Sequence, residues 1–144
     1  MPKLSPRQWL LLILAIIGWA MVFVFQDFDF THFKFIPDQY AQGHIAEGDG
    51  WRFAINKGMR FLLNDLFSLL FIYALFNNKG YSQLALLVMA FGLLILLPTY
   101  LILAIYYQEE GFHLLMFLHR ITMNPWLMLL LVPAFLYQAN KKSE

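Results

Sequence analysis

The chain has 144 residues, of which 60% are hydrophobic and 13% are charged, and its formal net charge is +1. Soluble domains carry about 25% charged residues, so this composition indicates a membrane protein that works in or at the bilayer. The ten lysines and arginines form no basic stripe, which argues against nucleic acid as a partner. The lack of cysteine excludes disulfides, thiolate metal sites and a cysteine nucleophile.

The first apolar segment covers residues 9–25 and contains no charge. Lys3 and Arg7 precede it, as in a signal peptide, but bulky residues follow it at 25–28, where signal peptidase requires small ones. We therefore expect the segment to be retained as a membrane-spanning helix.

A long polar loop, residues 26–56, follows the first segment. It opens with the stretch DFDFTHFKF, in which phenylalanines alternate with polar residues, and this pattern suits a segment lying at the bilayer interface. Gly43, Gly48 and Gly50 then interrupt any regular structure. We expect an irregular, mobile loop there.

The second segment contains unusual polar residues. A span needs about 20 residues at 1.5 Å each, so a helix that ends at Phe76 begins near Lys57, and Asp65 then lies close to the bilayer centre. Arg60, Asn64 and Ser68 recur every four residues and share one face, with Asp65 beside them. An acid at this depth usually faces a partner or a wet cavity.

The third segment, residues 81–107, has no charge before its end, and Pro98 should kink it. The fourth contains Asn124-Pro125, a favourable helix start, but the helix from there to Gln138 is too short to cross the hydrocarbon core. Residues 112–123 therefore enter the membrane as well, which gives a kinked span over 112–138. Pro133 should kink this span too.

These segments predict an all-α membrane protein, a single domain over residues 1–144 with four transmembrane helices. The tails and the tight 77–80 turn carry basic residues and one acid, so we expect both termini on the cytoplasmic side of the inner membrane. Aromatic and amide side chains near the span ends are typical of interface anchors. These are Trp9, Tyr81, Tyr107, Tyr137 and Gln138.

The polar residues of the second and fourth segments could meet in one cluster that binds a partner. Its members would be Arg60, Asn64, Asp65, Ser68, Arg120 and Asn124. In this hypothesis Asp65 pairs with Arg120. Two alternatives remain open: Asn64 and Ser68 act as packing contacts between helices, and both arginines extend their charged ends to the outer interface.

An independent enzyme is not expected. The four histidines show no His-x-x-x-His spacing, and Glu109 with His113 forms only a weak candidate metal pair. There is no recognisable Ser-His-Asp arrangement and no phosphate-binding glycine loop. An intramembrane hydrolase based on Asp65 lacks a second acid or base. We predict no metal and no cofactor.

Two stretches resemble a known family: RFLLNDLFSLLFIY at residues 60–73, and HRITMNPWLMLLLVPAFLYQ at residues 119–138. They look like the exosortase F system-associated membrane proteins of Bacteroidota. The shared features are the Arg60, Asn64 and Ser68 stripe, Arg120 ahead of Pro125, and the closing PAFLYQ. The first and third segments resemble those of the family only in being apolar helices.

The resemblance implies a non-enzymatic accessory subunit of an exosortase system, which sorts and processes surface proteins with a C-terminal membrane anchor. Such a subunit would bind the exosortase or the transmembrane tail of its substrate. Exosortases resemble cysteine transpeptidases, and a chain without cysteine cannot be that enzyme. The alternative is a small transporter or ion-conducting oligomer that uses Asp65 as its titratable group.

Overall fold

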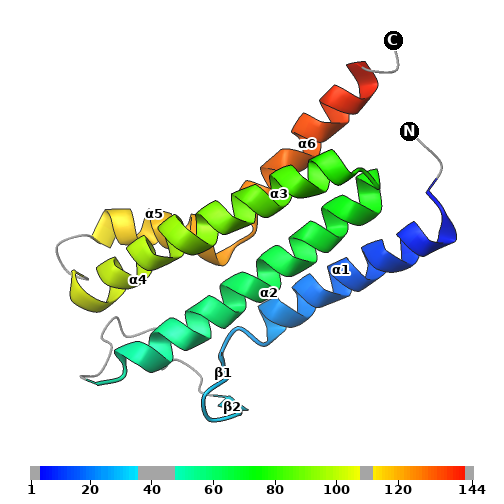
Figure 1. Ribbon diagram of the computed structural model, residues 1–144. Helices are drawn as coiled ribbons and strands as arrows, with labels where there is room; N and C mark the ends of the chain where they lie inside the picture. The colour runs from blue at the N-terminus through cyan, green and yellow to red at the C-terminus, as the bar shows by residue number, and fades with distance from the viewer. Residues whose placement is uncertain (1–3, 36–47, 108–111, 142–144) are drawn as a thin grey trace.

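The computed structural model describes residues 4–35, 48–107 and 112–141. Nearly all of its regular structure is helical (Figure 1). The elements are α1 (Pro6–Val24), β1 (Phe28–Asp29), β2 (Lys34–Phe35), α2 (Gly50–Phe76), α3 (Lys79–Phe91), the π-helical segment η1 (Gly92–Leu96), α4 (Leu97–Tyr106), α5 (Phe112–Met123) and α6 (Trp126–Lys141).

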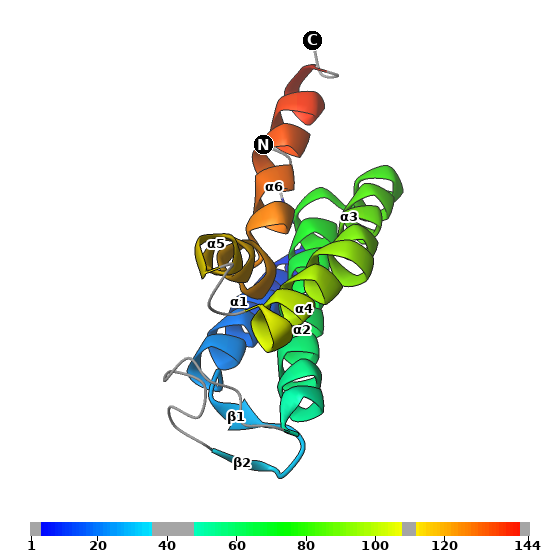
Figure 2. The ribbon, with the colours of Figure 1, turned by 90° about the vertical axis from the view of Figure 1, so that its left-hand side faces the viewer.

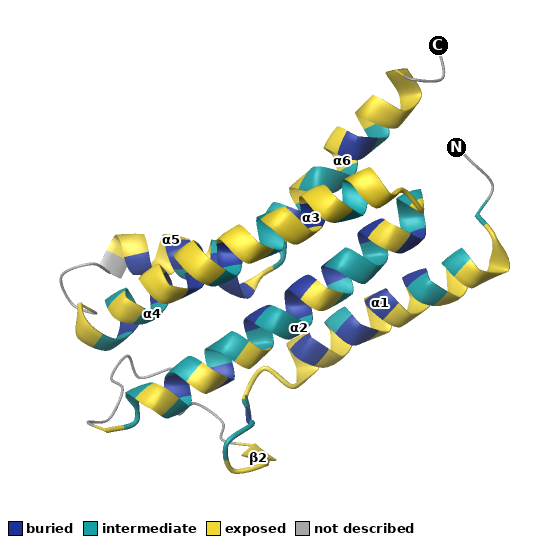
Figure 3. Ribbon diagram, in the orientation of Figure 1, coloured by how far each residue is buried: buried dark blue, intermediate teal, exposed yellow. Residues whose placement is uncertain are grey.

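Three helical stretches are long and apolar enough to cross a membrane: α1, α2 and the continuous run of α3, η1 and α4. A fourth exists if α5 and α6 count as one broken span, in which the chain bends by 57° between the two helices. Figure 3 shows α2 as the most enclosed helix, while the outer sides of α1, α3 and α6 are exposed. Exposed apolar faces on long helices fit a lipid environment, which confirms the predicted helical, multi-pass class.

Helix α1 packs closely on α2. Ser5 and Gln8 form a capping box at its start, and Pro6 occupies the first turn. Its buried residues recur every three or four positions, from Leu12 to Val22, so a single stripe faces α2. Gly18 lies on this stripe, and a Cβ there would collide with the ring of Phe67. The two helices can approach this closely because residue 18 has no side chain.

Helix α2 begins at Gly50, earlier than the predicted start near Lys57. Its 27 residues extend about 40 Å, whereas the hydrocarbon core is about 30 Å thick. The prediction was wrong on this boundary because it equated the helix with its membrane-embedded part. The helix ends at Phe76. Its C-cap residue, Asn77, has a left-handed φ of 46°, and Asn78 caps the start of α3.

The aromatic stretch after α1 folds as a small antiparallel hairpin, with Phe28 opposite Phe35 and Asp29 opposite Lys34. The ring of Phe28 packs edge-on against those of Phe30, Phe33 and Phe35. These strands were not predicted, because alternation of phenylalanine with polar residues fits a hairpin as well as an interfacial segment. Gly43 lies outside the described residues, and Gly48 has a φ of +90°.

The third span contains the π-helical segment η1, which ends two residues before Pro98. Proline cannot donate a backbone hydrogen bond, and such helical irregularities often accompany that loss. Gly92 opens the segment, and a Cβ there would approach the ring of Phe61 to 2.8 Å. The fourth span breaks at Asn124-Pro125, while Pro133 lies inside α6.

The apolar interior has two clusters. One surrounds Phe53, Phe61, Tyr100 and Met123, and the other surrounds Ile72, Ala85, Met128 and Phe135. Along α2, the buried polar residues Asn64, Asp65 and Ser68 lie between these clusters. The interior therefore has an apolar end, a polar middle and a second apolar end.

Candidate functional site

The polar middle of α2 is bonded to α1. The indole Nε1 of Trp19 donates to the Asn64 carbonyl oxygen at 3.3 Å and to the Ser68 hydroxyl at 3.2 Å. The Ser68 hydroxyl donates to the same Asn64 carbonyl at 2.7 Å. Ser68 is 1% exposed. Its hydroxyl thus joins two helices in the interior of the bundle.

Asn64 also bonds α2 to the break in the fourth span. Its side-chain Nδ2 donates to the Met123 carbonyl oxygen at 2.8 Å. In an unbroken helix, that carbonyl would accept from a backbone N–H four residues later, but α5 ends at Met123. Asn64 therefore supplies a donor to a carbonyl at a helix end. Asn124 similarly donates from its side chain to the Arg120 carbonyl at 3.1 Å.

Asn64 and Ser68 thus satisfy polar groups within the chain, as expected if they act as packing contacts between helices. They do not form an exposed stripe, since both are buried. Their hydrogen bonds are made to α1 and to the end of α5, so both residues are engaged inside the bundle.

Asp65 points elsewhere. It is 7% exposed and makes no hydrogen bond or ion pair among the described residues. Its carboxylate lies near η1, where a Cβ on Gly92 would come within 3.9 Å of Oδ2. Successive residues of a helix differ by about 100° in direction, so Asn64 and Asp65 face different neighbours.

The proposed ion pair between Asp65 and Arg120 is absent from the described structure. Arg120 is exposed on α5, and Asp65 is buried against η1. The prediction brought the two charges together from their depth alone, and depth does not fix the direction in which a helical residue points.

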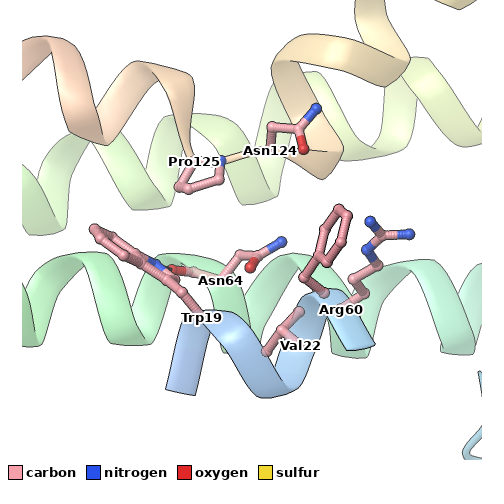
Figure 4. A pocket seen from close by; sticks show the side chains of 7 residues that line it. Trp19, Val22, Arg60, Asn64, Asn124 and Pro125 are labelled. Atoms are coloured by element: carbon pink, nitrogen blue, oxygen red, sulfur yellow. Dashed lines mark hydrogen bonds between the residues drawn. The ribbon is translucent and has the colours of Figure 1, made fainter. Parts of the chain in front are cut away.

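A pocket of about 180 Å³ opens between α1, α2 and the α5–α6 break. Figure 4 shows Trp19, Val22, Arg60 and Asn64 on one side and Asn124 and Pro125 on the other. Phe23 completes the lining. The Nε atom of Arg60 is buried and has no hydrogen-bond partner. Three of the six predicted cluster residues, Arg60, Asn64 and Asn124, therefore line one pocket.

A second polar cluster, around Asp29 in the hairpin, was not predicted. The Asp29 carboxylate is 3% exposed. It accepts hydrogen bonds from Asn56 Nδ2 at 2.9 Å, Arg52 at 3.1 Å and the backbone N–H of Thr31 at 2.9 Å. Asn56 also binds the hairpin backbone, because its Oδ1 accepts a hydrogen bond from the Phe30 N–H at 2.8 Å. These bonds hold the hairpin on the first turns of α2.

The pKa of Asp29 reflects competing effects. Burial alone would raise it, but the hydrogen bonds from Thr31, Asn56 and Arg52 outweigh burial and hold the pKa well below its usual range. The carboxylate is therefore charged while the hairpin is docked. Arg52 also binds Asp49 at 3.0 Å, three residues earlier. The three-residue spacing of Asp49 and Arg52, which Asp29 and His32 share, was a sequence signal that could have indicated ion pairs here.

The remaining predicted site residues are mostly at the surface. Trp9, Tyr107, Tyr137 and Gln138 are exposed, as interface anchors would be. Tyr81 instead stacks on Phe135 with ring centroids 4.4 Å apart. Glu109 lies outside the described residues, and the part of the chain that the structure describes has no group of three metal-ligating side chains.

Fold and site together define an α-helical, multi-pass membrane protein whose central helix carries an internal polar layer. No protein-family model, curated protein or solved structure matches the chain.

Proposed function

We propose that this chain is a non-enzymatic accessory protein of the inner membrane that binds another integral membrane protein through α6. The resemblance of residues 60–73 and 119–138 to exosortase-associated proteins makes an exosortase the proposed partner. The observation that carries the proposal is the exposed side of α6, in a bundle where the central residues Asn64 and Ser68 are already bonded internally.

In this proposal the chain spans the membrane four times, with α5 and α6 as one broken span and both termini in the cytoplasm. The start of α1, the α2–α3 turn and the end of α6 lie at the same end of the bundle (Figures 1 and 2). Arg7, Lys79 and Lys141 belong to this end, whereas Asp29 and Asp49 lie at the other. Basic residues flanking spans favour the cytoplasmic side.

Helix α6 packs on the bundle by a narrow side. Met128 and Phe135, seven residues apart, are its buried residues, and the second half of α6 extends past α3 (Figures 1 and 2). The opposite side is exposed. It consists of Trp126, Leu130, Pro133, Ala134 and Tyr137, in which the adjacent Pro133 and Ala134 lie three or four residues from Leu130 and Tyr137. We call this the α6 outer face.

The α6 outer face has two properties that suit a partner helix. Pro133 and Ala134 are compact, and small residues allow the backbones of two membrane helices to approach closely. Pro133 also has no N–H to donate to the Leu129 carbonyl, so this oxygen can accept from a hydroxyl of a partner helix. Such contacts provide affinity where lipid and protein are equally apolar.

The test is a gentle-detergent pull-down of the tagged protein from its native membrane, followed by mass spectrometry. Ala134→Phe would hold a partner helix away from α6, and Ala90→Phe makes the same change on the exposed side of α3. We expect a larger membrane protein that is lost with Ala134→Phe and kept with Ala90→Phe. Equal recovery with both variants would refute docking on the α6 outer face.

A second candidate is ion or proton transport by an oligomer, and Asp65 supports it. A buried carboxylate without a partner at mid-membrane depth is typical of transport paths, and π-helical segments such as η1 often occur at functional sites. Liposomes containing only this protein would dissipate a proton gradient, and Asp65→Asn would abolish that leak. Liposomes that keep their proton gradient in the presence of the protein would exclude this function for the isolated protein.

A further inference from the structure

We propose that the pocket between α1, α2 and the α5–α6 break binds the phosphate group of an anionic membrane phospholipid, with Arg60 as the binding cation. This inference is separate from docking on the α6 outer face, since none of the residues of that face lines the pocket.

The charge of the pocket is the first argument. Arg60 makes no ion pair among the described residues, and its Nε is buried without a hydrogen-bond partner. The carboxylate of Asp27, in the turn after α1, attracts Arg60 electrostatically but lies beyond ion-pair distance. Lys57, three residues before Arg60, holds its ammonium over the Phe53 ring, 5.4 Å from the ring centroid, so Arg60 is the cation of the pocket lining. An arginine fork suits a phosphate because it donates two parallel hydrogen bonds.

The depth of the pocket is the second argument. If residues 57–76 of α2 fill the hydrocarbon core, Arg60 lies about 5 Å inside its boundary, at the end of the bundle away from the chain termini. An arginine side chain at this depth reaches the level of the lipid phosphates. Val22 and Phe23 come from the last turn of α1, which ends at the same level.

The walls and size of the pocket are the third argument. Trp19, Val22, Phe23 and Pro125 form an apolar wall beside the cation, and Asn124 adds an amide. The volume of about 180 Å³ is comparable with cavities of about 150 Å³ that admit benzene. A phosphate group fits inside, and the acyl chains would lie outside along the exposed apolar side of α1, which includes Ile16 and Ile17.

The test uses native mass spectrometry of the delipidated protein in detergent. The probes are phosphatidylglycerol, diacylglycerol with the same acyl chains, and inorganic phosphate as competitor. The variants are Arg60→Gln and Arg60→Lys. Arg120→Gln is the matched control, because it removes the same charge from an exposed site outside the pocket.

We expect phosphatidylglycerol to bind the wild-type protein and the Arg120→Gln variant equally. Arg60→Gln should bind it about tenfold more weakly, the loss expected for a charge-assisted hydrogen bond. Arg60→Lys should fall between them and provides the test if Arg60→Gln does not fold. Unchanged binding by both Arg60 variants, or equal binding of diacylglycerol, would overturn the proposal. Displacement of the lipid by millimolar inorganic phosphate would assign the site to free phosphate and overturn the lipid assignment.

Discussion

The side-chain amide of Asn64 donates to the Met123 carbonyl oxygen at 2.8 Å, so the middle of α2 is bonded to the end of α5 where the fourth span breaks. Both residues are buried. The break is therefore a fixed part of the architecture, with a side chain in place of the helical hydrogen bond that the break removes.

Replacing Asn64 with Leu should destabilise the protein by about 1–3 kcal/mol, because the buried Met123 carbonyl would lose its donor. Thermal unfolding in detergent measures the change. Gln83→Leu is the matched control, since Gln83 is exposed on α3 and should tolerate the same chemical change. Equal melting temperatures for the wild-type protein and the Asn64→Leu variant would contradict the role assigned to this amide.

Gly18→Ala should weaken the packing of α1 on α2 by about 1–3 kcal/mol, because the new methyl group collides with the ring of Phe67. Phe67→Leu removes the aromatic ring and should restore part of the loss when the two changes are combined. A double-mutant cycle in detergent measures this coupling. If the two substitutions had additive effects on stability, contact with Phe67 would not be the reason for glycine at position 18.

Asp65→Ala and Arg120→Ala should have independent effects on stability, since the two side chains form no ion pair in the described structure. Their double-mutant cycle should give a coupling energy below about 0.5 kcal/mol. If one alanine substitution rescued the stability lost through the other, the result would support the direct ion pair that the sequence suggested.

Docking of the hairpin on α2 should weaken in acid. The pKa of Asp29 in the folded protein lies below its unfolded value of about 4, so the unfolded state binds more protons as the pH falls through this range. The stabilisation is therefore complete above about pH 4 and is lost as the pH falls towards the folded pKa. Hydrogen exchange of residues 28–35, corrected for intrinsic pH dependence, measures it.

Asp29→Asn should remove this acid dependence, and Asp27→Asn, an exposed change in the preceding turn, should leave it intact. If the hairpin lost its protection from hydrogen exchange identically in both variants as the pH falls, another group would control its docking.

The sequence predicted the helical membrane class because long uncharged runs permit few alternatives in lipid. Of the six residues of the predicted polar cluster, Arg60, Asn64 and Asn124 line one pocket, and the other three do not. The direction in which each helical side chain points was harder to predict. Asn64 and Asp65 are adjacent in sequence but face different helices, which only the packing of the bundle determines.

The Asp29 cluster could not be predicted either. It joins residues 23 to 27 positions apart through a hairpin whose alternating pattern also fits a segment lying on a membrane. The start of α2 was misplaced for a related reason. The bilayer limits the embedded length of a helix, whereas the contacts of Arg52 and Asn56 stabilise turns beyond that limit.

The most direct test of the proposed accessory function is site-specific cross-linking in the native membrane. The chain has no cysteine, so Ala134→Cys and Ala90→Cys each introduce a single attachment point for a photoactivatable probe. We predict that the probe at residue 134, on the α6 outer face, cross-links a larger membrane protein, and that the probe at residue 90, on α3, does not. Cross-links to lipid alone from both positions would contradict docking through α6.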